Sequence, residues 1–271
     1  SDRDHFVLAT KYSLLDRRGD PNFSGNHRKN MMRSIEASLK RLNTDHIDLF
    51  YLHAWDFMTP IEEVLRGIDD LVRSGKVLYA GISDTPAWIV SQANTIADLR
   101  GWTRFNALQI EHSLLQRTVE RDLLPMAKEL DIAVTAWAAL AGGALTGKYL
   151  EANEEAKRLA EGSTRLNERS RAITQTVVQV AQELGCSPAH VALNWVRQKN
   201  QVVIPIIGAR KASQIEDSLG CLQFPLPAEA IAQLNSVSAI ELGFPHDFLQ
   251  GPSVNAILFS DQKDLIENHR K

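Results

Sequence analysis

Short apolar, β-branched runs alternate along this chain with longer amphipathic runs, and this alternation restricts the possible folds more than any other feature. The extended runs lie at 6–10, 47–53, 77–83, 107–110, 133–136 and 202–206. Apolar residues recur at helical spacing over 28–42, 61–74, 88–99, 118–130, 172–184, 188–198, 213–221 and 228–237. Strands that alternate with helices in this way form parallel βαβ units. We therefore expect one α/β domain over residues 1–271, with six strand-then-helix units.

The number and length of these units favour a (β/α)8 barrel of TIM type. Such a barrel needs eight strands and roughly 250 residues, and the chain has 271 residues. A sheet of six strands would leave two open edges, which natural proteins avoid. We therefore expect two N-terminal units ahead of Ser1. The polar stretch 151–170 is interpreted as a surface insertion, and helical periodicity is lost after Leu242, toward a tail that is expected to fray.

Charge, hydropathy and cysteine content exclude several kinds of partner. A formal net charge of -3 gives no basis for binding nucleic acid. The longest mostly apolar run, 132–145, contains a threonine and two glycines and is shorter than the ~20 residues that a membrane helix needs. Cys186 and Cys221 have no CxxC partner, and no signal peptide is visible. We therefore expect two core thiols and a cytoplasmic protein.

Lys11 and His53 end the first two predicted strands, where the active sites of barrels gather. Because strand residues alternate between faces, Tyr51 and His53 share one face, and Tyr12 points away from Lys11. Tyr12 and Trp55 are expected to form walls of a substrate pocket. The alternative for Lys11 is a solvated strand cap, and the alternative for His53 is a satisfied core histidine.

Four polar or aromatic side chains end the next three strands: Ser83, Asp84, Gln109 and Trp137. A carboxylate only accepts hydrogen bonds, whereas a glutamine amide both donates and accepts. A buried glutamine without a partner is costly, which favours a binding role for Gln109. Ser83 and Asp84 can instead cap the helix that follows, and Trp137 can instead be a core ring.

The loops after the last two strands suit a phosphate-bearing ligand. After Trp137 the loop includes Ala138, Leu140 and Gly142 and ends at Lys148, which either pairs with phosphate or faces solvent. Its glycines permit close approach of the backbone to a pyrophosphate. Barrels often bind phosphate at the last loops and a helix N-terminus. The corresponding residues here are Gly208, Arg210 and Lys211. No GxGxxG follows a strand, which excludes a Rossmann site.

Seven segments at these strand ends resemble the aldo-keto reductase family, in the family's order. They are VLATKY (7–12), DLFYLH (48–53), GISD (81–84), Gln109, TAW (135–137), GGALTGKY (142–149) and IPIIGAR (204–210). The resemblance implies an NADP(H)-dependent enzyme that reduces small aldehydes or ketones to alcohols, with the hydride supplied by the nicotinamide. It begins at the family's third strand, so we expect the family's aspartate and proton-donating tyrosine on the preceding units.

The same resemblance implies a role for each matched residue. Lys11 lowers the pKa of the donor phenol, and His53 orients and polarises the carbonyl. Ser83, Gln109 and Asp84, which stands where the family usually has asparagine, hold the nicotinamide carboxamide, and Trp137 stacks on its ring. The remaining cofactor contacts fall on Ala138, Leu140, Gly142, Lys148, Gly208, Arg210 for the 2′-phosphate, and Gln214, Asp217 and Ser218 for the adenosine.

Two other functions compete with reduction. One is a cofactor-binding but catalytically silent regulatory protein, since some members of the family serve ion channels. The other is a metal-dependent barrel hydrolase, which needs several His or Asp ligands at strand ends. Only His53 meets that requirement, so no metal site is expected.

Replacing Arg210 with alanine is expected to weaken NADPH binding much more than NADH binding. The charge-assisted contact to the 2′-phosphate, worth on the order of 1.5–3 kcal/mol, exists only for NADPH. Fluorescence titration of both cofactors measures the difference. Equal losses for the two cofactors would remove Arg210 from the 2′-phosphate site.

Overall fold

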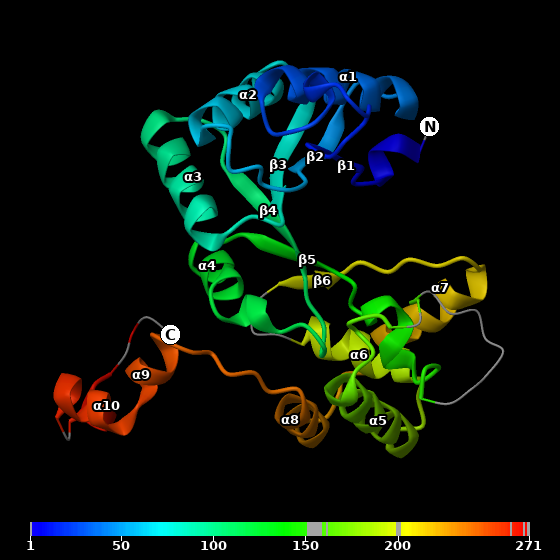
Figure 1. The fold of residues 1–271 in the computed structure, drawn as a ribbon, viewed down its shortest axis with the longest axis vertical. Helices are drawn as coiled ribbons and strands as arrows, with labels where there is room; N and C mark the ends of the chain where they lie inside the picture. The colour runs from blue at the N-terminus through cyan, green and yellow to red at the C-terminus, as the bar shows by residue number, and fades with distance from the viewer. Residues whose placement is uncertain are drawn as a thin grey trace.

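Six parallel strands, each hydrogen-bonded to the next in chain order, form the centre of the fold (Figure 1). The computed structural model describes residues 2–150, 159–160, 162–198, 202–260, 262–267 and 269. The strands are β1 (Ala9–Tyr12), β2 (Ile47–Leu52), β3 (Val77–Ser83), β4 (Phe105–Glu111), β5 (Ala133–Trp137) and β6 (Val203–Pro205). This is the α/β fold with a parallel sheet that the alternation predicts, and it is consistent with a TIM-type barrel.

Ten α-helices lie among the described residues. Figure 1 shows α1 to α4 along one side of the sheet, α5 to α8 near its β5–β6 end, and α9 and α10 standing apart. They are α1 (Arg28–Leu42), α2 (Ile61–Arg73), α3 (Ala87–Arg100), α4 (Leu123–Glu129), α5 (Glu168–Glu183), α6 (Pro188–Arg197), α7 (Ala212–Leu219), α8 (Ala228–Val237), α9 (His246–Gln250) and α10 (Pro252–Phe259). Short 3₁₀ turns are η1 (Asp2–His5), η2 (Pro21–Phe23), η3 (Thr118–Glu120), η4 (Ala141–Thr146), η5 (Gly220–Gln223) and η6 (Lys263–Leu265).

Several expected spans are wrong at their ends: β1 begins at Ala9 and not at Phe6, and α4 begins at Leu123, after the 3₁₀ turn η3, and not at Thr118. α5 begins four residues earlier than expected, because Asn167 caps it. The Asn167 side chain accepts from the Ser170 amide (2.9 Å), and the Ser170 hydroxyl accepts from the Asn167 amide (2.8 Å). α9 and α10 are not expected from the sequence. Most of their large apolar residues, among them Phe248 and Ile257, are exposed, so the single buried Val254 leaves no stripe for periodicity to detect.

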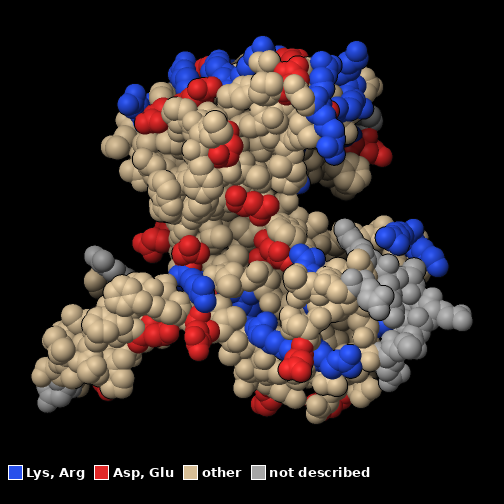
Figure 2. Space-filling model, viewed as in Figure 1, with Lys and Arg blue, Asp and Glu red and all other residues tan. Residues whose placement is uncertain are grey.

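The outer face of the sheet and the helices facing it share one hydrophobic core. Its buried members include Phe50, Leu52, Ile82, Leu108, Ile110 and Val134 from the strands and Ile35, Leu65, Ile68, Val90 and Ala127 from the helices. Figure 2 shows a hollow between the half of the molecule that holds α1 to α3 and the half that holds α5 to α8.

The inner face of the sheet is organised by one aromatic ring. Lys11, Tyr51 and Gly81 lie in register on β1, β2 and β3. The Tyr51 ring occupies the space beside Gly81, where a Cβ would lie 2.4 Å from ring carbons. Its hydroxyl lies 3.4 Å from the Thr135 hydroxyl of β5. Tyr51 therefore spans the interior from the second strand to the fifth.

Substituting Gly81 with alanine is expected to lower the free energy of unfolding by about 1–3 kcal/mol, because the added methyl collides with the Tyr51 ring. In a Tyr51→Ala background the same substitution should have little effect, because the ring is gone. Urea unfolding of the four proteins in this double-mutant cycle measures the coupling. Gly208→Ala, where a Cβ meets no atom within 4 Å, is the control. Additive losses at positions 51 and 81 would contradict the contact.

Candidate active site at the carboxyl ends of the strands

The parallel strands bring six predicted side chains together at the carboxyl ends of the strands, and we call this place the edge of the sheet. They are Lys11, His53, Ser83, Asp84, Gln109 and Trp137. Lys11 is half-buried, with its ammonium 5.7 Å from the centre of the Tyr51 ring. His53 follows the end of β2, and its backbone amide donates to the Tyr12 carbonyl oxygen (3.0 Å). The edge therefore carries two cationic or titratable groups close together.

Lys11, His53 and Asp84 act on one another electrostatically. Burial lowers the pKa of Lys11, and the Asp84 carboxylate opposes this shift. Burial also lowers the pKa of His53, as does the Lys11 ammonium to a smaller extent, while Asp84 again opposes. His53 is therefore neutral at lower pH than a free histidine, and the Lys11 ammonium is a stronger acid than that of a free lysine.

Trp137 is fixed by a hydrogen bond at the edge of its ring. Its indole N–H donates to Asp84 Oδ1 over 3.2 Å. Asp84 adopts a left-handed backbone conformation, with φ of 41°, which aspartate tolerates better than most residues. Because the bond uses the ring edge, the orientation of the Trp137 plane is set while its face is left for packing. The guanidinium of Arg165 lies 5.9 Å from the ring centre.

Ser83 has a buried polar atom with no protein partner. Among the residues that the structure describes, its Oγ makes no hydrogen bond. A buried hydroxyl left unpaired is costly, and either a water molecule or a ligand can supply the missing partner. The Gln109 amide nitrogen donates to the Thr135 hydroxyl (3.1 Å), which uses one of its two N–H groups. One donor of Gln109 is thus committed to holding the side chain in place.

The loop after β5 has the backbone conformation that its glycines make possible. Gly142 and Gly143 have φ values of 69° and 91° inside η4, and Leu140 precedes that turn. Ala138 is also left-handed, with φ of 54°. The Lys148 side chain folds back over the loop, since a Cβ on Gly143 would lie 2.8 Å from Lys148 Cε. Lys148 therefore lies against the glycines instead of extending away from them.

The second predicted group follows β6 and surrounds the start of α7. The Ile206 amide donates to the Ala136 carbonyl oxygen (2.8 Å), so this loop leaves the sheet beside Trp137. The Gln214 side chain accepts from the Arg210 amide (2.8 Å) and holds the loop to the helix. Gly208, Arg210, Lys211, Gln214 and Asp217 are exposed, and Ser218 is buried.

The expectation that Tyr12 lines a substrate pocket is wrong. Tyr12 is 3% exposed, its ring stacks on Phe50 at 5.3 Å, and its hydroxyl donates to the Asn26 carbonyl oxygen (3.3 Å). Because Lys11 faces the interior of the sheet, its neighbour must face the helices. Trp55 stays beside the edge, partly buried against the core, with its amide 3.5 Å from the Asp84 carbonyl oxygen.

Sequence reasoning missed an ion pair between Glu111 and Arg165. The two side chains meet at 2.5 Å beside a cavity of about 300 Å³. Burial raises the pKa of Glu111, and Arg165 opposes that shift. Glu111 could have been found, because it lies two residues after Gln109 on the same face of β4. The described part of the expected surface insertion, 159–160 and 162–170, thus reaches the strand ends; residues 151–158 and 161 lie outside the described ranges.

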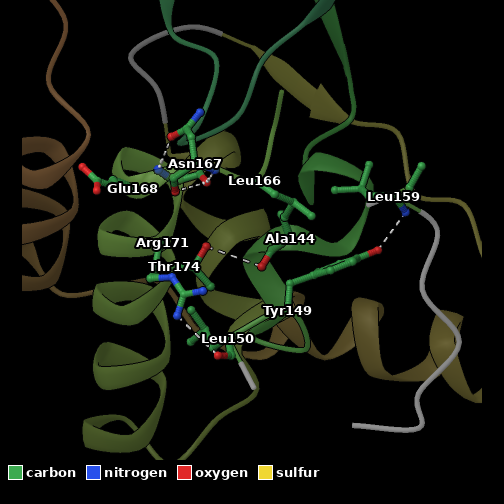
Figure 3. Close-up of a pocket in the computed structure, with 11 residues that line it drawn as sticks. Ala144, Tyr149, Leu150, Leu159, Leu166, Asn167, Glu168, Arg171 and Thr174 are labelled. Carbon is green, nitrogen blue, oxygen red and sulfur yellow. Dashed lines mark hydrogen bonds between the residues drawn. The ribbon is translucent and has the colours of Figure 1, made fainter. Parts of the chain in front are cut away.

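A larger cavity, of about 750 Å³, lies between η4 and α5 (Figure 3). Several polar groups drawn there are paired with protein, among them the Thr174 hydroxyl with the Ala144 carbonyl oxygen (3.4 Å) and the Tyr149 hydroxyl with the Leu159 amide (2.9 Å). None of the strand-end residues lines it. We therefore place the candidate site at the strand ends and not in this cavity.

The described residues contain no helix that is both long and apolar enough to cross a membrane. They also contain no cluster of three or more His, Cys, Asp or Glu side chains that could hold a metal ion.

Comparison with known proteins agrees with the strand-end motifs. The family model described as "Aldo/keto reductase family" matches residues 1–239, and the chain belongs to that family. It is similar to the putative aryl-alcohol dehydrogenase AAD10 of Saccharomyces cerevisiae, at 37% identity over 91% of this chain and 90% of that protein.

Two longer relatives extend the comparison. The aryl-alcohol dehydrogenase [NADP(+)] of Phanerodontia chrysosporium is 37% identical over 99% of this chain and 71% of its own length. Norsolorinic acid reductase A of Aspergillus parasiticus is 36% identical over 91% of this chain, which spans 64% of that protein. The family and its relatives support an oxidoreductase.

Stacking of Trp137 on a nicotinamide ring stays a prediction, and tryptophan fluorescence tests it. NADPH should quench the protein's emission, and Trp137→Ala should remove a good part of the quenching and weaken binding, because the ring contact is lost. Trp88→Phe, an exposed tryptophan on α3, is the matched control and should leave quenching unchanged. Undiminished quenching in the Trp137 variant would exclude the stacking role.

Proposed function

We propose that the protein is an NADP(H)-dependent oxidoreductase that interconverts aryl aldehydes or ketones and the corresponding alcohols. The observation that carries the proposal is the placement of Lys11 and His53 beside the unpaired, buried hydroxyl of Ser83 at one edge of the sheet. The names of the relatives, aryl-alcohol dehydrogenase and norsolorinic acid reductase, support carbonyl chemistry. Trp55 supplies aromatic surface for an aryl substrate.

The residues at the edge fit a nicotinamide. Ser83 Oγ and the second N–H of Gln109 can bond its carboxamide, and the face of Trp137 can stack on its ring. NADPH, when bound, supplies the hydride. The Asp84 carboxylate accepts a hydrogen bond from the Trp137 indole N–H, so in this proposal Asp84 holds the indole in place.

The phosphate end of the cofactor is assigned to the two loops beyond β5 and β6. Gly142 and Gly143 have no side chains to keep a pyrophosphate away from the backbone, and Lys148 lies against them with its positive charge. Arg210 and Lys211 add two exposed cationic side chains at the start of α7, in position for a 2′-phosphate. This pair of basic groups favours NADP(H) over NAD(H).

Lys11 and His53 act on the carbonyl oxygen in this proposal. A neutral imidazole can donate one N–H to that oxygen, and the ammonium stabilises the negative charge that develops on it. The hydroxyls of Tyr12 and Tyr51 are held by Asn26 and Thr135 and do not serve as donors. Because both tyrosine hydroxyls are already hydrogen-bonded within the protein, a second candidate function is also favoured, that of a family member that binds NADP(H) without turnover.

The remaining proposals concern organisation and compartment. We infer that residues 1–271 form one domain. Cys186 and Cys221 are both free thiols, as expected in the reducing cytoplasm.

Substituting Lys11 with methionine is expected to reduce NADPH-dependent reduction of an aromatic aldehyde by about 10²–10³, the usual effect of losing a group that stabilises charge on the reacting oxygen. NADPH affinity should be almost unchanged, since Lys11 faces the carbonyl. The control is Lys76→Met, which removes a lysine paired with Glu36 at the opposite end of the sheet. Tight NADPH binding with no turnover by the unaltered protein would support the silent candidate and overturn the catalytic one.

A further inference from the structure

We propose that Asn26 and Asp56 are positioning residues that fasten the loop after β1 to the loop after β2 and so hold His53 at the strand ends. The catalytic importance of that position rests on the proposed function. We call the hydrogen bonds between Asn26 and Asp56 the clasp. The clasp does not depend on the proposed function, because it is formed by the two loops themselves.

Asn26 and Asp56 bond to each other reciprocally. The Asn26 amide donates to Asp56 Oδ2 (2.7 Å), and the Asp56 amide donates to Asn26 Oδ1 (2.8 Å). The Asn26 side-chain nitrogen also donates to the Ala54 carbonyl oxygen (2.8 Å). Asn26 is 0% exposed, so water does not compete for these bonds.

Asp56 gathers three more donors from its own loop. Oδ1 accepts from the Met58 and Thr59 amides, both at 2.9 Å, and Oδ2 accepts from the Thr59 hydroxyl (2.8 Å). Burial alone would raise the pKa of Asp56, but these donors and the Asn26 amide hold it below its ordinary value. The carboxylate is therefore ionised at neutral pH, and its hydrogen bonds are charge-assisted.

Four consecutive amides, from His53 to Asp56, all bond outside their own loop. His53 donates to Tyr12, Ala54 to the Ser13 hydroxyl (3.0 Å), Trp55 to Asp84 and Asp56 to Asn26. Three of these acceptors belong to β1 or the loop that follows it. The segment carrying His53 is thus held residue by residue against the strand that carries Lys11, which sets the relation between the two side chains.

Two similar clusters elsewhere provide matched controls. Asn94 on α3 is also 0% exposed and also bonds reciprocally, with the Phe105 amide and carbonyl (2.9 and 3.0 Å). Asp69 on α2 is 3% exposed and accepts from Arg73 and from Thr103. Neither cluster contacts the two loops, so both report on the loss of buried hydrogen bonds alone.

The first test compares Asn26→Ala with Asn94→Ala by amide hydrogen exchange and NMR titration of His53. Asn26→Ala should speed exchange at residues 54–56 by about tenfold, because it removes the two hydrogen bonds of the Asn26 side chain, to the Asp56 amide and to the Ala54 carbonyl oxygen. It should also raise the pKa of His53 toward the ordinary value, because burial is the main cause of its depression. Asn94→Ala should change neither. Equal changes in the two variants would overturn the proposal.

The second test applies even if Asn26→Ala does not fold. It compares Asp56→Asn with Asp69→Asn, and both substitutions preserve the shape of the side chain. Asparagine offers one acceptor oxygen in place of two, so Asp56→Asn should loosen residues 54–56 and raise KM for the aldehyde, while Asp69→Asn should not. Unchanged exchange at 54–56 in folded Asp56→Asn would also overturn the clasp. Exchange needs no turnover, so a protein without reductase activity contradicts the proposed function and leaves this test intact.

Discussion

The contact between the Tyr51 ring and the bare backbone of Gly81 determines how the inner face of the sheet is filled. Any side chain at position 81 would displace the ring. With the ring in place, β2 reaches across to Thr135 on β5, and Lys11 is held above the aromatic face at 5.7 Å. The lysine is therefore half-buried at the strand ends, and burial lowers its pKa. The absence of a side chain at Gly81 thus determines the surroundings of the proposed catalytic residue Lys11.

Asp84 connects the remaining charges of the edge. Its carboxylate opposes the lowering of the pKa of both Lys11 and His53, adds to the raising of the pKa of Glu111, and accepts from Trp137. The sequence resemblance puts asparagine at this position in most of the family. An asparagine could accept the indole N–H but would carry no charge. The carboxylate therefore gives this chain its own balance of charge around a shared arrangement of residues.

Elements whose buried face follows a regular period could be predicted from the sequence. The spans of α1, α8 and β3 match the expected ones residue for residue, because their apolar positions alternate at the helical or strand period. α9 and α10 could not be found in this way, since most of their large apolar side chains are exposed and only Val254 is buried. Tyr12 was assigned to the pocket although the alternation that places Lys11 inside places Tyr12 outside. Arg165 pairs with Glu111 across 54 residues, from a polar segment without periodicity, so no local pattern could join them.

Hydrogen exchange of the protein with and without NADPH tests most directly whether the strand ends and the start of α7 form one cofactor site. If they do, NADPH should slow exchange in residues 81–85, 135–148 and 208–218 together, and the three segments should respond at the same cofactor concentration. Protection confined to the first turns of α5 beside the larger cavity, or no protection at a saturating concentration of NADPH, would contradict this placement.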